Sequence, residues 1–164
     1  MKTLLTTLFI FSVAFAQAQT DSAQSSPQPF PDVPAFELLS LDSATFITKK
    51  DLKSQPLLLM YFSPDCDHCQ HQVEDMIKNM TLFSNIQIIL ATHQPFENMK
   101  GFYEKYKLSQ YPNIRIGRDT KFFLPPIFRM RNLPYLALYD KEGIQLTKFD
   151  GNATIEQLKK AFGL

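Results

Sequence analysis

The spacing of hydrophobic residues along the chain predicts an α/β domain. Residues 57–62 form an apolar run and residues 86–90 are apolar except for Gln87, which is typical of strands that are buried on both faces of a sheet. Between them apolar residues recur at steps of three and four, which predicts a helix and completes a βαβ unit. The apolar stripe of this helix comprises Cys69, Val73, Met76, Ile77, Met80 and Phe83, and the opposite face carries His68, Gln72, Asp75 and Asn79.

The segments before and after this unit predict further elements. Residues 35–41 and 44–47 predict a short leading hairpin that turns at Asp42-Ser43. Residues 114–116 predict a short strand, whereas residues 121–131 are aromatic and broken by prolines and receive no assignment. A second amphipathic helix precedes that strand, with apolar side chains at Phe96, Met99, Phe102, Tyr103 and Tyr106.

The C-terminal third predicts two strands and a helix. Residues 135–139 are apolar, the turn residues 140–143 follow, and residues 144–149 predict the partner strand of a hairpin. Thr154 and Gln157 have the spacing of a capping box at a helix start. The apolar face of that last helix comprises Ile155, Leu158 and Phe162. The predicted order is therefore hairpin, βαβ, helix, and then strand, strand and helix.

Residues 1–18 have the pattern of a cleavable signal peptide. Lys2 precedes an apolar run over residues 3–15 that is short for a membrane span, and Ala16-Gln17-Ala18 fits a signal-peptidase site. A second site, after Ala16, and an uncleaved N-terminal anchor stay open as alternatives. No cysteine lies near the cleavage site, which excludes a lipoprotein anchor. The sequence thus predicts export, into a bacterial periplasm.

The rest of the chain is predicted to hold a linker and one domain. Residues 19–34 are rich in Ser, Gln and Pro without periodicity, typical of a flexible linker, and residues 35–164 suit one domain with one core. The chain has 17 basic and 16 acidic residues, so the formal net charge is zero once Lys2 is removed. Such a balance argues against a nucleic-acid or anionic-membrane partner.

Cys66 and Cys69 are the two cysteines of the chain, and they lie where the apolar run at 57–62 gives way to the predicted helix. On one helical turn two thiols lie close enough for a disulfide, whose Cα atoms are about 4.4–6.8 Å apart. Unpaired N–H groups and the helix dipole stabilise a thiolate at the first position. The spacing predicts a redox dithiol. A structural disulfide is the alternative, although so small a loop would restrict the unfolded chain little.

Four segments carry a wider pattern: Tyr-Phe-Ser-Pro-Asp-Cys-Asp-His-Cys at 61–69, Asn132-Leu133-Pro134 before a strand, residues 139–143 in the last hairpin, and Phe149-Asp150-Gly151 before the last helix. In this order they resemble thioredoxin-fold proteins, in particular the exported TlpA/ResA-like thiol–disulfide oxidoreductases. The resemblance implies a thioredoxin-like α/β fold with a central mixed sheet flanked by helices. It also implies an N-terminal β-hairpin and a helix inserted after the βαβ unit.

The resemblance also implies roles for individual residues. Cys66 would be the nucleophile, Cys69 the resolving thiol, and Pro134 a cis-proline that faces them. Asn132 and Leu133, just before that proline, would bind the substrate chain. The implied partners are protein thiols or disulfides and a membrane electron donor or acceptor for recycling. We predict neither a cofactor nor a resident metal.

The sequence departs from the family pattern in three places. Asp65 stands where an aromatic residue commonly precedes the motif, and Asp67-His68 replaces the usual dipeptide that ends in proline. Gln72 occupies a position that often holds a proton-shuttling Glu, and Glu74 lies on a neighbouring helix face. His68 would stabilise a reduced Cys66, whereas the negative charge of Asp67 would disfavour its thiolate. Both are therefore predicted to tune the redox potential, and the direction of electron flow stays open.

Copper handling is the alternative function. Thiolates and imidazole favour Cu(I), and Cys66 and Cys69 could act with His68, His71 or a more distant His93. Thioredoxin-fold copper chaperones usually have a wider cysteine spacing and a distant histidine. No Met-rich segment flanks the motif, which favours the redox interpretation.

Overall fold

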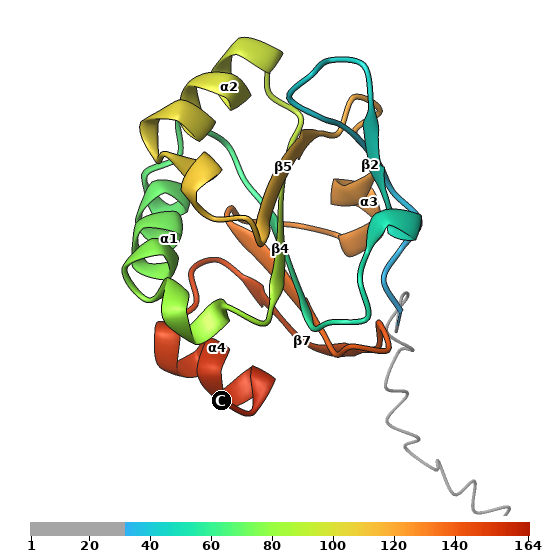
Figure 1. The fold of residues 1–164 in the computed structure, drawn as a ribbon. Helices are drawn as coiled ribbons and strands as arrows, with labels where there is room; N and C mark the ends of the chain where they lie inside the picture. The colour runs from blue at the N-terminus through green and yellow to red at the C-terminus, as the bar shows by residue number, and fades with distance from the viewer. Residues whose placement is uncertain (1–31) are drawn as a thin grey trace, which may run out of the picture.

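A computed structural model describes residues 32–164 as a sheet with helices on both faces (Figure 1). Its strands are β1 Glu37–Leu39, β2 Phe46–Thr48, β3 Leu57–Tyr61, β4 Gln87–Thr92, β5 Ile114–Arg118, β6 Tyr135–Tyr139 and β7 Gln145–Asp150. The strand order is β2-β1-β5-β4-β3-β6-β7. Strands β3, β4 and β5 are parallel to one another, and the other neighbours pair antiparallel. The predicted α/β fold with a central mixed sheet is confirmed.

The helices lie in two unequal layers. They are α1 Asp67–Lys78, α2 Phe96–Lys105, α3 Leu124–Phe128 and α4 Ile155–Phe162, with the 3-10 turns η1 Lys49–Asp51, η2 Met80–Phe83 and η3 Leu108–Gln110. Helices α1, α2 and α4 cover one face of the sheet and α3 lies on the other (Figure 1). The leading hairpin and the inserted helix α2 are where the sequence placed them. The capping box of Thr154 and Gln157 begins α4 as predicted.

Strand β3 is buried on both faces because each of its faces meets a different core. Leu58 and Met60 pack with side chains of α1, α2 and α4, and Leu57 and Leu59 pack with side chains of α3 and the leading hairpin. None of the five residues of β3 is more than 2% exposed. A strand between two apolar layers needs apolar residues at every position, which explains the continuous run in the sequence.

The folded domain begins earlier than the sequence analysis predicted. Asp32 forms an isolated antiparallel bridge with Ile144, and the Val33 N–H donates to the Gly143 carbonyl at 3.0 Å. Val33 is only 3% exposed and packs in the core beside β3. Residues 32–34 therefore belong to the domain and not to the linker, because their backbone and apolar side chains have partners there. The signal peptide predicted at 1–18 and the rest of the linker lie outside the described residues.

The unassigned stretch at 121–131 contains helix α3. Pro125 and Pro126 lie in its first turn, where the missing N–H of proline costs no hydrogen bond. The carboxylate of Asp119 accepts hydrogen bonds from the backbone N–H groups of Phe123 and Leu124, both at 2.9 Å. A side chain outside the segment thus starts a helix that local periodicity does not reveal.

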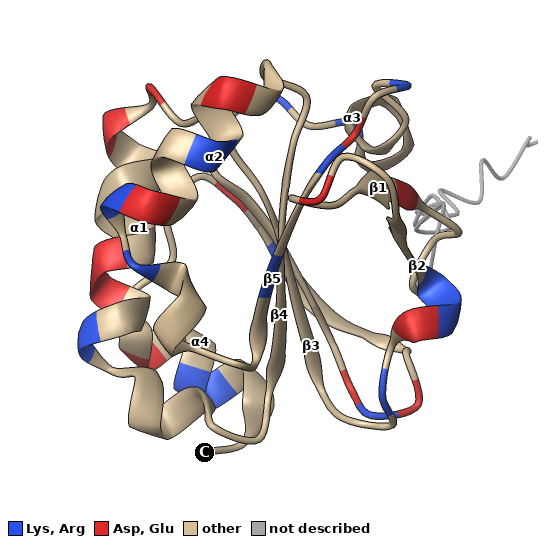
Figure 2. Cartoon of the chain, turned by 45° about the horizontal axis from the view of Figure 1, so that its top comes forward, with Lys and Arg blue, Asp and Glu red and all other residues tan. Residues whose placement is uncertain are grey.

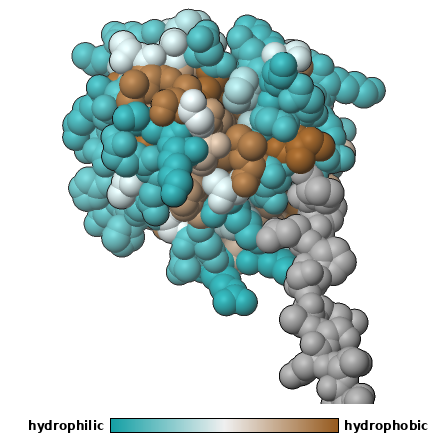
Figure 3. Space-filling model, turned by 90° about the horizontal axis from the view of Figure 1, so that it is seen from below, coloured by the Kyte–Doolittle hydropathy of each residue, from teal (hydrophilic) through white to brown (hydrophobic). Residues whose placement is uncertain are grey.

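The surface of the domain is mixed in charge and polarity. Both α1 and α2 carry basic as well as acidic residues (Figure 2). Hydrophobic side chains also reach the surface at the end of the molecule that is seen from below (Figure 3). No helix within residues 32–164 is long and apolar enough to cross a membrane.

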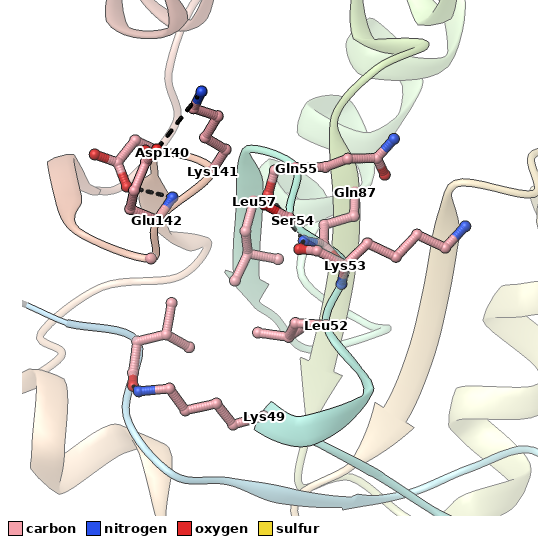
Figure 4. A pocket seen from close by; sticks show the side chains of 12 residues that line it. Lys49, Leu52, Lys53, Ser54, Gln55, Leu57, Gln87, Asp140, Lys141 and Glu142 are labelled. Atoms are coloured by element: carbon pink, nitrogen blue, oxygen red, sulfur yellow. Dashed lines mark hydrogen bonds and ion pairs between the residues drawn. The ribbon is translucent and has the colours of Figure 1, made fainter.

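A pocket of about 270 Å³ opens beside the turn between β6 and β7 (Figure 4). Lys49, Lys53, Gln87 and Glu142 are among its lining residues. The Gln87 side chain connects two parts of the pocket wall, because it donates to the carbonyls of Lys53 and Gln55 at 2.8 and 2.9 Å. The pocket lies where β3 and β4 begin and includes neither cysteine, so it is separate from the candidate site.

Candidate functional site

The dithiol lies at the N-terminus of α1, directly after β3. Cys66 is the N-cap residue, with an extended backbone, and its sulfur accepts a hydrogen bond from the Cys69 N–H at 3.3 Å. The loop before it is tied to the helix, because the Gln70 side chain donates to the Pro64 carbonyl at 2.8 Å. A sulfur at this position faces the unpaired N–H groups of the first turn, which stabilise negative charge.

The two thiols differ in exposure. Cys66 is half-buried and Cys69 is fully buried, and their sulfur atoms lie 2.6 Å apart as free thiols. The Cys69 thiol donates to the Cys66 sulfur. Burial raises the pKa of the Cys69 thiol, and its hydrogen bond to Cys66 raises it further. The accessible sulfur is thus Cys66, with a protonated thiol held directly behind it, in the geometry that the helical stripe predicted.

The segment before β6 lies against Cys66. The Leu133 carbonyl oxygen is 3.9 Å from the Cys66 sulfur, although the two residues are 67 positions apart in the chain. The Leu133–Pro134 peptide bond is cis, and Pro134 is buried with its carbonyl accepting from the Gly151 N–H at 2.9 Å. Asn132 is exposed, and its N–H donates to the Asp150 carboxylate at 2.8 Å. The structure therefore brings this predicted segment to the dithiol.

Asp67 and His68 project from the first turn of α1 and are exposed. The His68 carbonyl accepts a hydrogen bond from the Asn152 side chain at 2.7 Å, which ties the motif to the loop before α4. Within residues 32–164, neither side chain forms a hydrogen bond with the Cys66 sulfur. Any influence of either side chain on Cys66 would therefore act through space.

Gln72 is buried, contrary to the prediction that it lies on the outer face of α1. It is only 1% exposed, and its Oε1 accepts from the Ala153 N–H at 2.8 Å, while its Nε2 has no partner among the described residues. Gln72 is three residues after Cys69, a spacing that places both on the apolar stripe. The burial of Gln72 could therefore have been predicted from its spacing to Cys69. Glu74 is bound elsewhere, since its Oε1 accepts from the Tyr106 hydroxyl on the α2 side at 3.2 Å.

Of the three histidines considered for copper, His68 lies within the dithiol motif and is exposed, and the other two have other surroundings. His71 is exposed on α1, and His93 stacks on Tyr61 with ring centroids 6.3 Å apart. Within residues 32–164, no group of three or more His, Cys, Asp or Glu side chains is placed to hold a metal ion.

A second cluster, not predicted from the sequence, lies on the same edge of the sheet as the dithiol. We call this edge of the sheet the dithiol edge. It comprises the residues that follow β3, β4 and β5 and those that precede β6. Asp119 follows β5 and is only 2% exposed, with the Tyr61 hydroxyl 3.5 Å from its carboxylate. Burial raises the pKa of Tyr61, and the charge of Asp119 raises it further. Capping spacing does not reveal Asp119 in the sequence, because the N–H groups that it binds lie four and five residues further along the chain.

Comparisons with known proteins give likenesses of fold. No family model and no curated protein matches the chain. A secreted disulfide oxidoreductase of Mycobacterium tuberculosis, homologous to E. coli DsbE, is 17% identical with a TM-score of 0.62, covering 77% of this chain and 91% of that chain. StoA from Bacillus subtilis is 18% identical with a TM-score of 0.61, covering 81% of this chain and 98% of that chain.

A thioredoxin-like protein from Aeropyrum pernix is 15% identical with a TM-score of 0.62, covering 77% of this chain and 87% of that chain. These structures share the architecture and differ widely in sequence. The predicted thioredoxin-like fold is thereby confirmed for this chain, with Cys66 and Cys69 at the helix start that follows its central strand.

Proposed function

We propose that the protein is a thiol–disulfide oxidoreductase that exchanges disulfides with exported protein substrates through Cys66 and Cys69. The observation that carries this proposal is the pairing of a half-buried Cys66 with a fully buried Cys69 whose sulfur lies 2.6 Å behind it. A substrate sulfur can approach only the first thiol, and the second is in place to displace it. A structural disulfide would need no such difference in exposure.

Reduction of a substrate would proceed in two exchanges. The Cys66 thiolate attacks one sulfur of a substrate disulfide, so that a mixed disulfide forms and the other substrate sulfur leaves as a thiolate. Cys69 then loses its proton and attacks the Cys66 sulfur, which releases the second substrate sulfur and leaves a Cys66–Cys69 disulfide. Two electrons pass from the protein to the substrate. Oxidation of a substrate is the same sequence in reverse.

Leu133 is the residue that we assign to the substrate backbone. The N–H of Asn132 already donates to Asp150, whereas no described residue accepts a hydrogen bond from the N–H of Leu133. A substrate chain could pair with Leu133 as an added strand beside the Cys66 sulfur. Pro134, buried and bonded through its carbonyl, would hold Leu133 in position. The Asn132 side chain, which is exposed, would contact the flanking substrate residues.

Alkylation and trapping test the roles of the two thiols. In the reduced protein, Cys66 should be alkylated first because Cys69 is buried and burial raises its pKa. Cys66→Ser should abolish disulfide exchange with a peptide substrate. Cys69→Ser should accumulate mixed disulfides through Cys66, because no resolving thiol remains. Equal alkylation rates for both thiols, or exchange by Cys66→Ser, would contradict the proposal.

The reduction potential decides the direction of electron flow and the tuning roles of Asp67 and His68. For this two-electron couple a tenfold change in equilibrium constant corresponds to about 30 mV. If His68 stabilises the reduced form, His68→Gln should lower the potential measured against glutathione. Asp67→Asn should raise it, because a negative charge beside Cys66 is removed. Unchanged potentials in both variants would mean that the two side chains are only surface residues.

Export and a membrane-bound recycling partner complete the proposal. The N-terminal pattern at residues 1–18 supports export, and one of the similar structures is described as secreted. Mass spectrometry of the protein from a periplasmic fraction should find a chain that begins at Gln19. A protein that stays in the cytoplasm with residues 1–18 attached would contradict this part.

A further inference from the structure

Phe122, on the dithiol edge, is an exposed aromatic residue held in an unfavourable backbone conformation. Its φ is +51°, in the left-handed region that bulky residues rarely adopt, and the residue is 51% exposed. Strain of this kind persists only where the surroundings impose it, and it clusters at functional sites. Neither burial nor helix formation explains why a phenylalanine stands at this position.

The surroundings that impose this conformation centre on Asp119. Its two carboxylate oxygens separately accept the N–H groups of Phe123 and Leu124, and its own carbonyl accepts the Phe122 N–H at 3.3 Å. Asp119 is itself buried against Tyr61. The loop is therefore fixed from both sides of Phe122, and the ring is presented at a constant place.

His93 extends the surface that Phe122 begins. The two rings meet edge to face with centroids 5.0 Å apart, and the His93 ring is nearly parallel to the ring of Tyr61, with centroids 6.3 Å apart. The His93 backbone is held as well, since its carbonyl accepts from Arg118 at 3.4 Å. We call the exposed rings of Phe122 and His93 the aromatic platform.

The sheet places this platform within reach of a substrate bound at Cys66. Tyr61 ends β3 five residues before Cys66, His93 follows β4, and Phe122 belongs to the loop after β5. Strands β3, β4 and β5 are neighbours in the sheet, so His93 lies about one strand spacing from the end of β3 and Phe122 about two, roughly 10 Å. An extended chain rises about 3.3 Å per residue, so that distance corresponds to about three substrate residues.

Asp65 and Asp67 are exposed beside Cys66, whereas the exposed charged residues between α3 and β6 are basic. Arg129 and Arg131 are exposed between α3 and Leu133, and neither side chain has an ion-pair partner within residues 32–164. Lys121 is paired with Glu37 at 2.8 Å, and Asp119 is buried. This side of the edge therefore complements an acidic segment.

We propose that the aromatic platform seats a large apolar side chain of an extended, acidic segment of the substrate polypeptide, about three residues from the substrate cysteine. The inference rests on the proposed function and names its substrate class. Phe122 is then a specificity-determining residue, and the strain at its backbone is the cost of presenting the ring. The edge-to-face contact with His93 keeps that ring upright while the apolar side chain packs on it.

Two peptides linked to glutathione by a disulfide test the proposal. Both carry one cysteine and two glutamates, and one has Leu three residues to each side of the cysteine where the other has Gly. The wild-type protein should reduce the Leu peptide with a kcat/KM about tenfold higher than the Gly peptide. Phe122→Asn should bring this ratio close to one, since Asn adopts the left-handed region more readily but removes the ring. Phe46→Asn, at a similarly exposed phenylalanine on β2, should keep the ratio.

Stability and a small disulfide separate the ways in which the test can fail. Phe122→Asn should unfold at a urea concentration no lower than that of the wild type, because it relieves strain; a clearly lower midpoint would show a structural role and overturn the proposal. A ratio unchanged by Phe122→Asn, or a wild-type ratio near one alongside normal exchange with glutathione disulfide, would also overturn it. If the wild type exchanges with neither peptide nor with glutathione disulfide, the proposed function itself fails.

Discussion

Replacing Asp119 with Asn should loosen the loop that carries Phe122. The two carboxylate oxygens accept separate N–H groups at 2.9 Å, and the residue is 2% exposed. Asn keeps the shape but presents an NH₂ group where one oxygen stood, so one backbone N–H loses its acceptor and faces a donor. A hydrogen bond to a charged group contributes about 1.5–3 kcal/mol. We therefore expect the free energy of unfolding to fall by about 2–3 kcal/mol.

Urea unfolding followed by circular dichroism measures this loss. Asp75→Asn is the matched control, because Asp75 is exposed on α1 in a surface pair with Lys78, and such pairs contribute about 0–1 kcal/mol. The Leu-to-Gly peptide ratio should also fall in Asp119→Asn, since Phe122 is then no longer held in place. A loss of stability no larger than that of the control would refute the assignment of Asp119 as the residue that fixes this loop.

Three further predictions concern the core. A Cβ at Gly117 would lie 2.7 Å from the Cβ of Leu38, so Gly117→Ala should lower the free energy of unfolding in urea by about 1–3 kcal/mol. Gly101 on α2 has open space around it, so Gly101→Ala should raise that free energy by about 0.5–1 kcal/mol. Equal effects of the two substitutions would contradict the close packing at Gly117. Gln72→Glu buries a carboxyl whose pKa is raised by burial, so its stability relative to the wild type should decline between about pH 5 and pH 8, and a flat difference would argue against burial. Burial raises the pKa of Tyr135 in the folded protein to about 12, above its value in the unfolded chain. The stability that this pKa difference contributes is complete below about pH 10 and is lost as the pH rises towards 12. Tyr135→Phe should accordingly move the midpoint of alkaline unfolding to higher pH. An unchanged midpoint would show that ionisation of Tyr135 does not contribute to alkaline unfolding.

The sequence by itself determined the dithiol and most of the elements, with α3 as the exception. The apolar run of β3, the three-and-four spacing of α1 and the capping box of α4 depend on neighbours within one or two turns of chain. The placement of Cys66 at the helix start and Cys69 on its buried face follows from the same local periodicity. Local patterns of this kind are written directly in the order of residues.

Only the tertiary structure decided which distant groups meet those elements. Leu133 reaches Cys66 because β6 pairs antiparallel with β3, and Asp119 reaches Tyr61 because β5 lies on the other side of β4. The hydrogen-bond partner of the buried Gln72 is likewise distant, since Ala153 lies 81 positions away. Hydrogen bonds across such separations form only after the sheet has its strand order, and no local pattern of polar and apolar residues encodes that order. The proposed substrate surface therefore depends on the strand order of the sheet, whereas the placement of the two cysteines follows from their local spacing in the sequence.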